Sequence, residues 1–176
     1  MKEISYMIAK IKYKLLNDNK EVVSDYFRRS GMKVGKGCNI CCNIMTSEPY
    51  LVSLGNNVTI SGNVTFVTHD NSIAKISSEY ANIFGFIEIG NNCFLGQNST
   101  ILYGCTLADN IIVAAGSVVC SSFSESNIII GGNPARIIGN WERFSKKGKD
   151  LSMKRAEAFD AFKEGKKGKF LRKRGI

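Results

Sequence analysis

The stretch that decides the fold runs from Ile89 to Cys120. It reads in blocks of six residues: Ile89-GNNCF, Leu95-GQNST, Ile101-LYGCT, Leu107-ADNII, Val113-AAGSV and Val119-C. An aliphatic residue opens each block, a small residue usually follows it, and a small or aliphatic residue stands four places after the opener. Such a fixed period is typical of a solenoid, in which each unit buries its apolar edge by stacking on the next. Six residues fit a short strand and a tight corner, so three blocks predict one triangular coil.

The same blocks occur earlier in the chain, with two interruptions. They begin at Val34-GKGCN and Ile40-CCNIM, slip in register at Ser47-Glu48-Pro49, and resume at Leu54-GNNVT, Ile60-SGNVT and Phe66-VTHDN. The distance from Phe66 to Ile89 is 23 residues, which is not a multiple of six. We therefore predict that residues 71–86 leave the coil as a protruding loop. Excursions of this kind on a rigid scaffold are where functional residues concentrate.

Residues 1–31 have a helical pattern and form the first predicted segment. Apolar side chains recur at three and four places along one stripe: Ile4, Met7, Ile8, Ile11 and Leu15. A shorter helix follows and ends at Gly31. We interpret the pair as a cap over the open end of the solenoid, whose strand edges need a cover. Because lysines flank the stripe, contact with a membrane surface is a second interpretation.

Residues 140–176 form a basic C-terminal segment with a helical pattern at its start. They hold thirteen Lys or Arg and five Asp or Glu, which accounts for nearly all of the net charge of +9. The segment lacks the regularly interleaved aromatic residues of a single-strand nucleic-acid platform, so we expect no nucleic-acid partner. An anionic coenzyme, an anionic glycan and an anionic membrane surface remain open as partners of this charge.

The six cysteines are interpreted as small, reduced residues. Cys38, Cys93 and Cys105 all fall at the small position of their blocks. Cys38 and Cys41 form a CxxC pair, but a second pair is absent and the only histidine lies far along the chain. We therefore expect no metal. The chain has no apolar run of the roughly 20 residues that span a bilayer and no secretory signal, so the expected location is the cytoplasm.

The hexads, the Thr-His-Asp sequence at 68–70 and the Gly-Gly-Asn-Pro-Ala-Arg sequence at 131–136 resemble the hexapeptide-repeat acyltransferases. Bacterial polysaccharide and sugar O-acetyltransferases are the most similar branch. The resemblance implies a mainly β fold, a left-handed parallel β-helix over residues 32–139 that includes the loop at 71–86. It also implies transfer of an acetyl group from acetyl-CoA, in a homotrimer whose active sites lie between neighbouring chains.

His69 and Asp70 are the catalytic candidates that the resemblance implies. His69 occupies the position at which these enzymes carry a general base, immediately before a loop. The chemistry supports this residue type, because a hydroxyl acceptor must lose its proton to attack a thioester and imidazole titrates near neutral pH. Asp70 is a candidate to orient the ring or to shape the acceptor pocket. A carbonyl group or an acid elsewhere, such as Glu79 in the loop, remains open for the orienting role.

The acetyl-CoA side is transferred motif by motif from the same resemblance. Gly96 and Gln97 match the segment whose backbone amide faces the thioester, and Ala114 and Ala115 match the segment along which the pantetheine arm lies. Arg136 matches the basic residue that meets the phosphates of CoA, and its planar guanidinium suits that contact. The lysine that usually precedes the closing turn is missing, since residues 120–124 read Cys-Ser-Ser-Phe-Ser.

The acceptor is not fixed by these motifs. We predict a hydroxyl of a carbohydrate, such as a surface polysaccharide or its precursor. A nucleotide-sugar N-acetyltransferase is the main alternative, because its acceptor differs only by an amine, and an acyl transferase that uses an acidic acyl carrier protein is a second. A non-enzymatic trimeric scaffold is the alternative from a different class, and binding of acetyl-CoA with release of free thiol would separate it from an enzyme.

Overall fold

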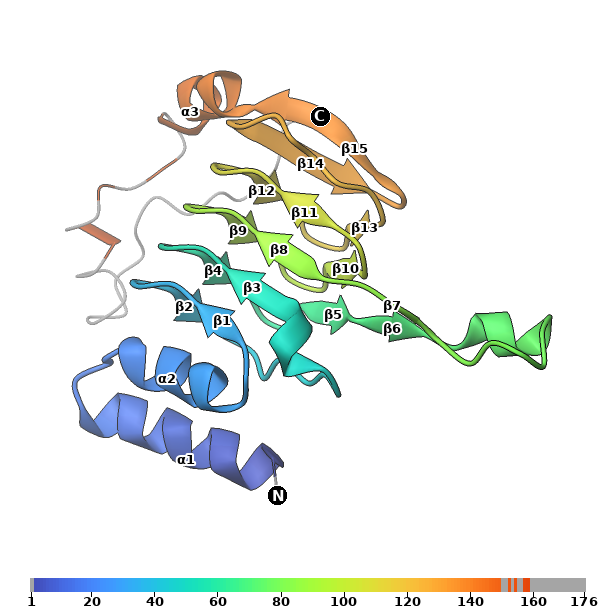
Figure 1. Cartoon of the computed structure of the whole chain (residues 1–176). Coiled ribbons are helices and arrows are strands. Elements are labelled where there is room, and N and C mark those ends of the chain that lie inside the picture. Colours follow the sequence, from blue (N-terminus) through green and yellow to red (C-terminus); the bar gives the residue numbers. More distant parts are fainter. Residues whose placement is uncertain (1, 150–151, 153, 155–156, 159–176) are drawn as a thin grey trace. The chain divides into compact units, whose positions relative to one another are not determined.

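The computed structural model describes residues 2–149, 152, 154, 157 and 158. It divides into two compact units, Met1–Ile138 and Gly139–Ile176. The first unit holds the repeats, and the chain winds through three sheets in turn (Figure 1). The second unit contains helix α3 (Trp141–Lys149), while most of the predicted basic segment lies outside the described residues.

Three sheets form the walls of the coil, and the strands that pair in successive turns are parallel. Sheet A contains β1 (Lys33–Val34), β3 (Val52–Leu54), β8 (Ile87–Ile89) and β11 (Thr106–Leu107). Sheet B contains β2 (Asn39–Ile40), β4 (Thr59–Ile60), β9 (Phe94–Leu95), β12 (Ile112–Val113), β14 (Ile128–Gly132) and β15 (Ala135–Asn140). Sheet C contains β5 (Thr65–Val67), β10 (Thr100–Leu102) and β13 (Val118–Val119).

The strand register confirms that three hexads make one turn of the coil. Leu107 pairs with Ile89, and Val113 pairs with Leu95, in each case 18 residues apart. Leu95 pairs with Ile60 across 35 residues, so 17 residues leave the coil between them. Ile60 pairs with Ile40 across 20 residues, so the earlier slip adds two residues to its turn. The strands on either side of both interruptions therefore remain in register.

Small polar side chains fill the interior near the corners, as the hexads predict. Cys38, Cys93 and Cys105 are almost completely buried. Ser99 and Ser117 are buried as well, and each hydroxyl donates a hydrogen bond of 2.7 Å to a backbone carbonyl three residues earlier. These bonds remove the cost of burying a hydroxyl in an apolar interior. Burial also raises the pKa of the Cys93 thiol, which keeps it protonated.

Asparagine and glycine form the corners of the coil. The A–B corner follows a sheet A strand, the B–C corner follows a sheet B strand, and the C–A corner follows a sheet C strand. Asn57 and Asn92 at A–B corners and Asn98 at a B–C corner have φ near +60°. Asparagine tolerates this left-handed conformation better than other residues with a Cβ, so its recurrence at one hexad position is explained by the turn.

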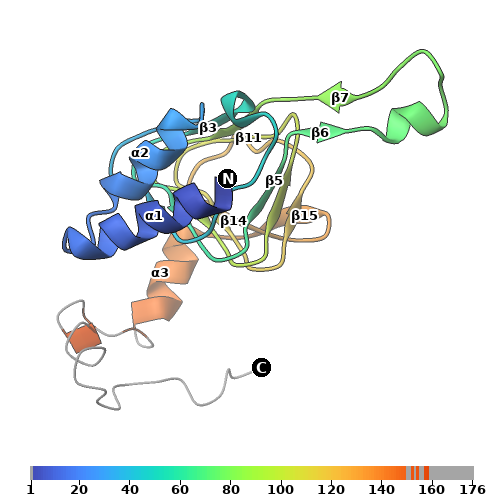
Figure 2. The same cartoon turned by 90° about the horizontal axis from the view of Figure 1, so that it is seen from below.

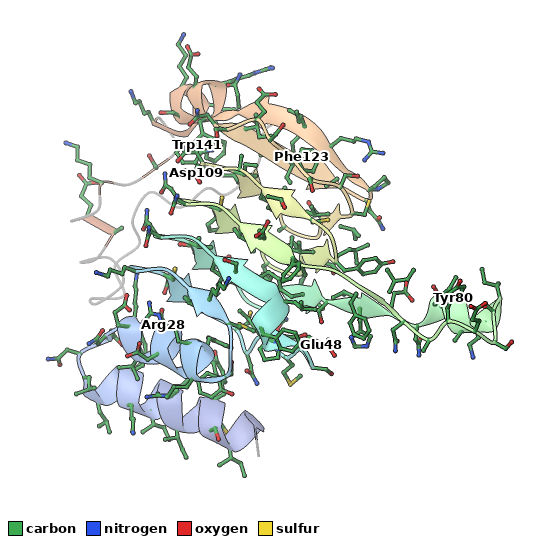
Figure 3. All side chains as sticks on the ribbon, in the orientation of Figure 1. Arg28, Glu48, Tyr80, Asp109, Phe123 and Trp141 are labelled. Carbon is green, nitrogen blue, oxygen red and sulfur yellow. The ribbon has the colours of Figure 1, made fainter. Side chains whose placement is uncertain are left out.

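Helix α2 (Glu21–Arg29) covers the first turn of the coil. Val23 and Phe27 are buried in the same apolar core as Cys38 and Ile40. The Arg28 guanidinium donates hydrogen bonds to the carbonyls of Val34 and Gly35 at 2.8 and 2.6 Å, which satisfies two acceptors at the end of sheet A (Figure 3). The helix is therefore fixed to the coil by burial and by hydrogen bonds to its backbone.

Helix α1 (Lys2–Leu15) packs with the face that the sequence analysis did not select. Ala9 is buried, and Tyr6 and Tyr13 are partly buried against the core. The predicted apolar stripe does not face the coil, because Ile4, Met7, Ile8, Ile11 and Leu15 are all exposed. The small Ala9 between two tyrosines allows close approach to α2, whereas the wider aliphatic stripe points away from it.

The predicted loop is a long arm that leaves the C–A corner (Figures 1 and 2). Its base is a two-stranded antiparallel ribbon of β6 (His69–Asp70) and β7 (Ile83–Phe84), in which His69 pairs with Phe84. The short helix η2 (Ser72–Lys75) follows β6. A second short helix, η1 (Pro49–Leu51), lies where the register slips before β3.

Candidate functional site

His69 lies at the base of the arm, directly after the chain leaves sheet C. The preceding residue, Thr68, is buried with 2% of its surface exposed, whereas the His69 side chain is 40% exposed. The carbonyl of Thr68 accepts a hydrogen bond from the amide of Gly85 at 3.1 Å, which closes the ribbon. The ring is thus held on an ordered backbone and remains accessible to a substrate.

Glu48 is the partner of this ring. Its Oε2 atom lies 2.8 Å from Nδ1 of His69, and its side chain is only 14% exposed. Glu48 belongs to the register slip at residues 47–49, which lies one turn of the coil before the turn from which the arm leaves. Figure 3 shows Glu48 near the base of the arm. The segment that interrupts the repeats therefore delivers a carboxylate to the histidine.

A closed set of hydrogen bonds holds this carboxylate. Thr68 donates its hydroxyl proton to Glu48 Oε2 at 2.7 Å, so the 2.6 Å contact between Thr46 and Thr68 has Thr46 as donor. The amide of Glu48 donates to Thr46 at 3.2 Å and completes the ring. The Thr68 bond is the largest cause that lowers the pKa of the Glu48 carboxyl, with His69 adding to it and partial burial opposing it.

The ionised carboxylate decides which nitrogen of His69 carries the proton. A carboxylate accepts hydrogen bonds and does not donate them, so Nδ1 of His69 is the donor in the 2.8 Å contact. The lone pair of the neutral ring is then on Nε2, the nitrogen that faces away from Glu48. An exposed imidazole with a free Nε2 and an orienting acid behind it has the arrangement of a general base.

Asp70 and Glu79, the two acids considered from the sequence, do not contact the ring in the structure. Oδ1 of Asp70 accepts a hydrogen bond of 2.7 Å from the amide of Ser72, and this bond is the main cause that lowers the pKa of the Asp70 carboxyl. The Tyr103 hydroxyl lies 3.5 Å from its other oxygen. Asp70 therefore fixes the first turn of the arm to the coil.

Exposed aromatic residues lie along the arm, and one of them lies beside the histidine. The ring of Phe84 lies 5.7 Å from that of His69, centre to centre, with the planes tilted by 44°. Tyr80 near the tip, Phe84 and Phe86 are each more than half exposed (Figure 3). The ring of Phe84 therefore offers a flat apolar surface beside the imidazole.

Gly96, Gln97, Ala114 and Ala115 lie together at the B–C corner. A Cβ on Gly96 would stand 2.5 Å from the amide nitrogen of Ala115, so the two turns of backbone touch there. The amide of Gly96 donates to the Val113 carbonyl, and that of Ala114 donates to the Ile130 carbonyl. Within residues 2–149, the amides of Gln97 and Ala115 donate no hydrogen bond.

The predicted phosphate contact lies above the same corner. A Cβ on Gly131 would stand 3.1 Å from the side chain of Ala114, and the amide of Gly132 donates to the Ser117 hydroxyl at 3.2 Å. Arg136 follows this turn and is exposed, with its guanidinium donating to the carbonyl of Ala135 at 2.8 Å. Within residues 2–149, the guanidinium donates no other hydrogen bond.

One chain does not bring the histidine and this corner together. His69 leaves the coil at the C–A corner, after sheet C, whereas Gln97 and Ala115 lie at the B–C corner, before it. The strands of sheet C stand between the two groups. A site that uses both groups requires the C–A corner of one chain to meet the B–C corner of another.

The CxxC pair has one buried and one exposed member. Cys38 is buried and its Sγ lies 3.2 Å from the Gly55 carbonyl, whereas Cys41 is exposed. Among the residues that the structure describes, no three His, Cys, Asp or Glu side chains gather as metal ligands. Burial raises the pKa of the Cys38 thiol, as expected for a structural residue.

Comparison with known proteins identifies both sequence and structural relatives. Residues 87–121 match the family described as the hexapeptide repeat of succinyl-transferase. The chain is 41% identical over 145 residues to protein CapG of Staphylococcus aureus, covering 80% of this chain and 83% of that protein. It is 30% identical over 110 residues to galactoside O-acetyltransferase of Escherichia coli, covering 62% of this chain but only 54% of that protein.

Solved structures show the same fold. A maltose O-acetyltransferase from Clostridium difficile 630 superposes with a TM-score of 0.54 at 24% identity, covering 79% of this chain and 85% of that one. A galactoside acetyltransferase in complex with coenzyme A superposes with a TM-score of 0.52 at 19% identity, covering 82% and 84%. At these identities the likeness concerns the fold.

Proposed function

The chain belongs to the hexapeptide-repeat acyltransferases, and on that premise we propose that it is an acetyl-CoA-dependent O-acetyltransferase whose acceptor is a carbohydrate hydroxyl. The observation that carries the proposal is the 2.8 Å contact between His69 Nδ1 and Glu48 Oε2, which leaves Nε2 as a base on an exposed ring. The relatives support the acceptor class, because galactoside and maltose O-acetyltransferases are among them.

The proposed reaction is a direct transfer without a covalent enzyme intermediate. Nε2 of His69 removes the proton from the sugar hydroxyl as its oxygen bonds to the thioester carbon. The tetrahedral intermediate then collapses, the carbon–sulfur bond breaks, and the imidazolium returns the proton to the CoA thiolate. Glu48 holds the ring in the required tautomer and stabilises the imidazolium that forms in between.

The B–C corner is the proposed binding site for the acyl donor, acetyl-CoA. The free amide of Gln97 is the proposed donor to the oxyanion on the thioester carbonyl, because a preorganised backbone N–H needs no rearrangement during the reaction. Gly96 allows the backbone turns to touch, and Ala114 and Ala115 leave room for the pantetheine arm. Arg136 is the proposed contact for the phosphates of CoA.

We further propose a homotrimer of left-handed β-helices with the active site between neighbouring chains. Two observations support this arrangement: the position of His69 and Gln97 at different corners of one chain, and the family to which the chain belongs. The proposed location is the cytoplasm, where acetyl-CoA is available. In this account the Asp70 carboxylate positions the arm that meets the acceptor.

Replacing His69 by Ala tests the proposal. We expect kcat to fall about 10²- to 10⁴-fold, the usual contribution of general-base catalysis, while the Kd for acetyl-CoA stays within about threefold of the wild-type value. Release of free thiol from acetyl-CoA, measured with a panel of sugars and amino sugars, reports the rate and the acceptor together. A variant that turns over near the wild-type rate would contradict the role of His69.

A matched pair of variants then decides which acid orients the ring. Glu48→Gln keeps the size of the side chain but removes the carboxylate, so we expect kcat to fall at least about tenfold with little change in KM for acetyl-CoA. Asp70→Asn makes the same chemical change one residue from His69 and should act mainly on KM for the acceptor. A larger loss of kcat in Asp70→Asn than in Glu48→Gln would reassign the orienting role.

A further inference from the structure

The first helix presents an apolar face that no part of its own unit covers. Helix α1 lies at the N-terminal end of the coil, and in Figure 1 helix α2 stands between it and the first strands. Five aliphatic side chains along it are 48–76% exposed: Ile4, Met7, Ile8, Ile11 and Leu15. At about 100° per residue these positions lie within a stripe roughly 100° wide, which is the width of an amphipathic face.

The opposite face of α1 fixes its orientation. Ala9 is 5% exposed, and the ring of Tyr6 lies 5.7 Å from that of Tyr26 and 6.0 Å from that of Phe27. Since these contacts hold one side of the helix against α2, the aliphatic stripe points outward. Five neighbouring side chains of this kind exceed the isolated exposed residues that are normal on a protein surface.

Lysines border the stripe on both sides. At 100° per residue, Lys10 and Lys14 lie along one edge and Lys12 lies along the other. The ammonium groups of Lys10 and Lys14 stand 5.0 and 5.5 Å from the centre of the Tyr13 ring, which packs on the opposite face of the helix. The ammonium group of Lys14 also lies 3.1 Å from Oδ1 of Asp18, in an ion pair that is exposed to solvent. The sequence of α1 contains four lysines and one glutamate.

From these observations we propose that α1 binds the surface of an anionic phospholipid bilayer, lying in the plane of the interface with its aliphatic stripe among the acyl chains. Charge complementarity selects this occupant, because lysines beside an apolar stripe match phosphate headgroups above acyl chains. A second copy of the chain packed on the same stripe would bring the lysines of two helices together, which is unfavourable.

The helix lies on the bilayer and does not cross it. Its 14 residues span roughly 21 Å, short of the ~30 Å hydrocarbon core. Among the residues that the structure describes, no helix is long and apolar enough to span a membrane. The proposal is independent of the proposed acetyl transfer, since it rests on α1 alone and on no residue of the catalytic arm or of the B–C corner.

Vesicle binding by the full chain tests the proposal. The test variant carries Ile4→Ser, Ile8→Ser and Ile11→Ser, which remove apolar area without changing charge, and Ser has nearly the helix propensity of Ile. We expect the wild-type chain to co-sediment with vesicles of equal phosphatidylglycerol and phosphatidylcholine. The triple variant should partition at least about tenfold more weakly, and phosphatidylcholine vesicles should bind little of either protein.

The controls separate the contribution of α1 to vesicle binding from that of the basic C-terminal segment, which is the same in all variants. Ile76→Ser, at a residue that is 84% exposed on the arm, should bind vesicles as the wild type does. Equal binding by the wild type and the triple variant would overturn the proposal, because the C-terminal charge would then suffice. A triple variant with unchanged vesicle binding and a smaller assembly in solution would assign the stripe to a second copy instead. Circular dichroism and Tm of the variants check that the fold is retained.

Discussion

The backbone amides at two corners of the same coil differ in their hydrogen-bond acceptors. At the A–B corner, the amide two places after the opener donates to a side chain of the next turn in three successive turns: Lys36 to Asn56 at 2.9 Å, Asn56 to Asn91 at 2.8 Å, and Asn91 to Asp109 at 2.7 Å. At the B–C corner, the equivalent amides of Gln97 and Ala115 have no such acceptor within residues 2–149.

The difference follows from one residue in each block. Asn or Asp two places after the opener supplies an oxygen at the A–B corner, and a parallel ladder of Asn57, Asn92 and Asn110 side chains reinforces it. At the B–C corner the same place holds Gly62, Gln97, Ala115 or Gly132. A backbone N–H without a protein acceptor bonds to water or to a ligand. The A–B corner is therefore closed by its own side chains. At the B–C corner the Gly132 amide is bonded to the Ser117 hydroxyl, but the amides of Gln97 and Ala115 remain available as donors.

Removing one amide from each corner should have opposite effects and gives the largest expected change. Gln97 precedes Asn98 at φ 60°, and Asn91 precedes Asn92 at φ 56°, so both occupy the turn position that favours proline. Gln97→Pro should lower kcat about 10²- to 10³-fold, the usual loss for one oxyanion donor, with Tm unchanged. Asn91→Pro should lower Tm with little effect on kcat, because its amide is already bonded within the protein.

Acetyl-transfer kinetics and thermal unfolding of the two variants provide the measurement. A normal kcat in Gln97→Pro would show that the free amide at the B–C corner takes no part in the reaction. A stable Asn91→Pro variant would show that the side-chain ladder does not hold the A–B corner.

Substitution of two glycines at the B–C corner should show how much close contact between turns and how much a positive φ each contribute to the loss of stability. A Cβ on Gly96 would meet the Ala115 nitrogen at 2.5 Å and the Val113 oxygen at 2.6 Å, so Gly96→Ala must push two turns of the coil apart. We expect this variant to lose about 3 kcal/mol of unfolding free energy, at the upper end for overpacking. Gly116→Ala should lose only about 1 kcal/mol, because its φ of +72° is unfavourable for Ala but no atom lies within 4 Å.

Chemical denaturation of the two variants measures both losses. Equal losses would mean that φ, and not the contact between turns, limits this corner.

The pH dependence of stability should reveal the smallest effect, at the A–B corner. Hydrogen bonds from Asn91 lower the pKa of the Asp109 carboxyl, so its contribution to stability is present above the ordinary Asp pKa and is lost as pH falls through the lowered value. Asp109→Asn keeps an oxygen acceptor but no charge. We expect Tm of this variant to fall below the wild-type value at about pH 6 and to approach it near about pH 2.

Tm measured at both pH values checks this expectation. A Tm difference that is the same at about pH 6 and about pH 2 would show that the charge of Asp109 is not what stabilises the corner.

The sequence was sufficient for the coil and for the place of the histidine. Its period predicts the 18-residue turn, and the break in the period predicts the arm after His69. Glu48 was missed as the partner of His69, although the register slip at residues 47–49 marked it as unusual. Two residues 21 positions apart meet only because both interruptions leave the coil near one corner, and no local pattern records that.

Two other features required three-dimensional contacts. The aliphatic period of α1 predicted a helix, but periodicity does not say which face is buried, and Ala9 with its flanking tyrosines packs better against α2 than the branched side chains do. The sequence motif did not distinguish the amide of Gly96 from that of Gln97 as the candidate donor to the thioester. Only the pairing of Gly96 with the Val113 carbonyl leaves Gln97 as the available donor.

Complementation between two inactive variants tests the central claim, that His69 of one chain acts on a thioester held at the B–C corner of another. His69→Ala and Gln97→Pro chains are co-expressed in equal amounts with different affinity tags, and mixed assemblies are isolated. If the site lies between neighbouring chains, one of the three interfaces in each mixed trimer joins an intact His69 to an intact Gln97, so the isolated mixed assemblies should regain about a third of wild-type activity. Mixed assemblies no more active than either parent would contradict the claim.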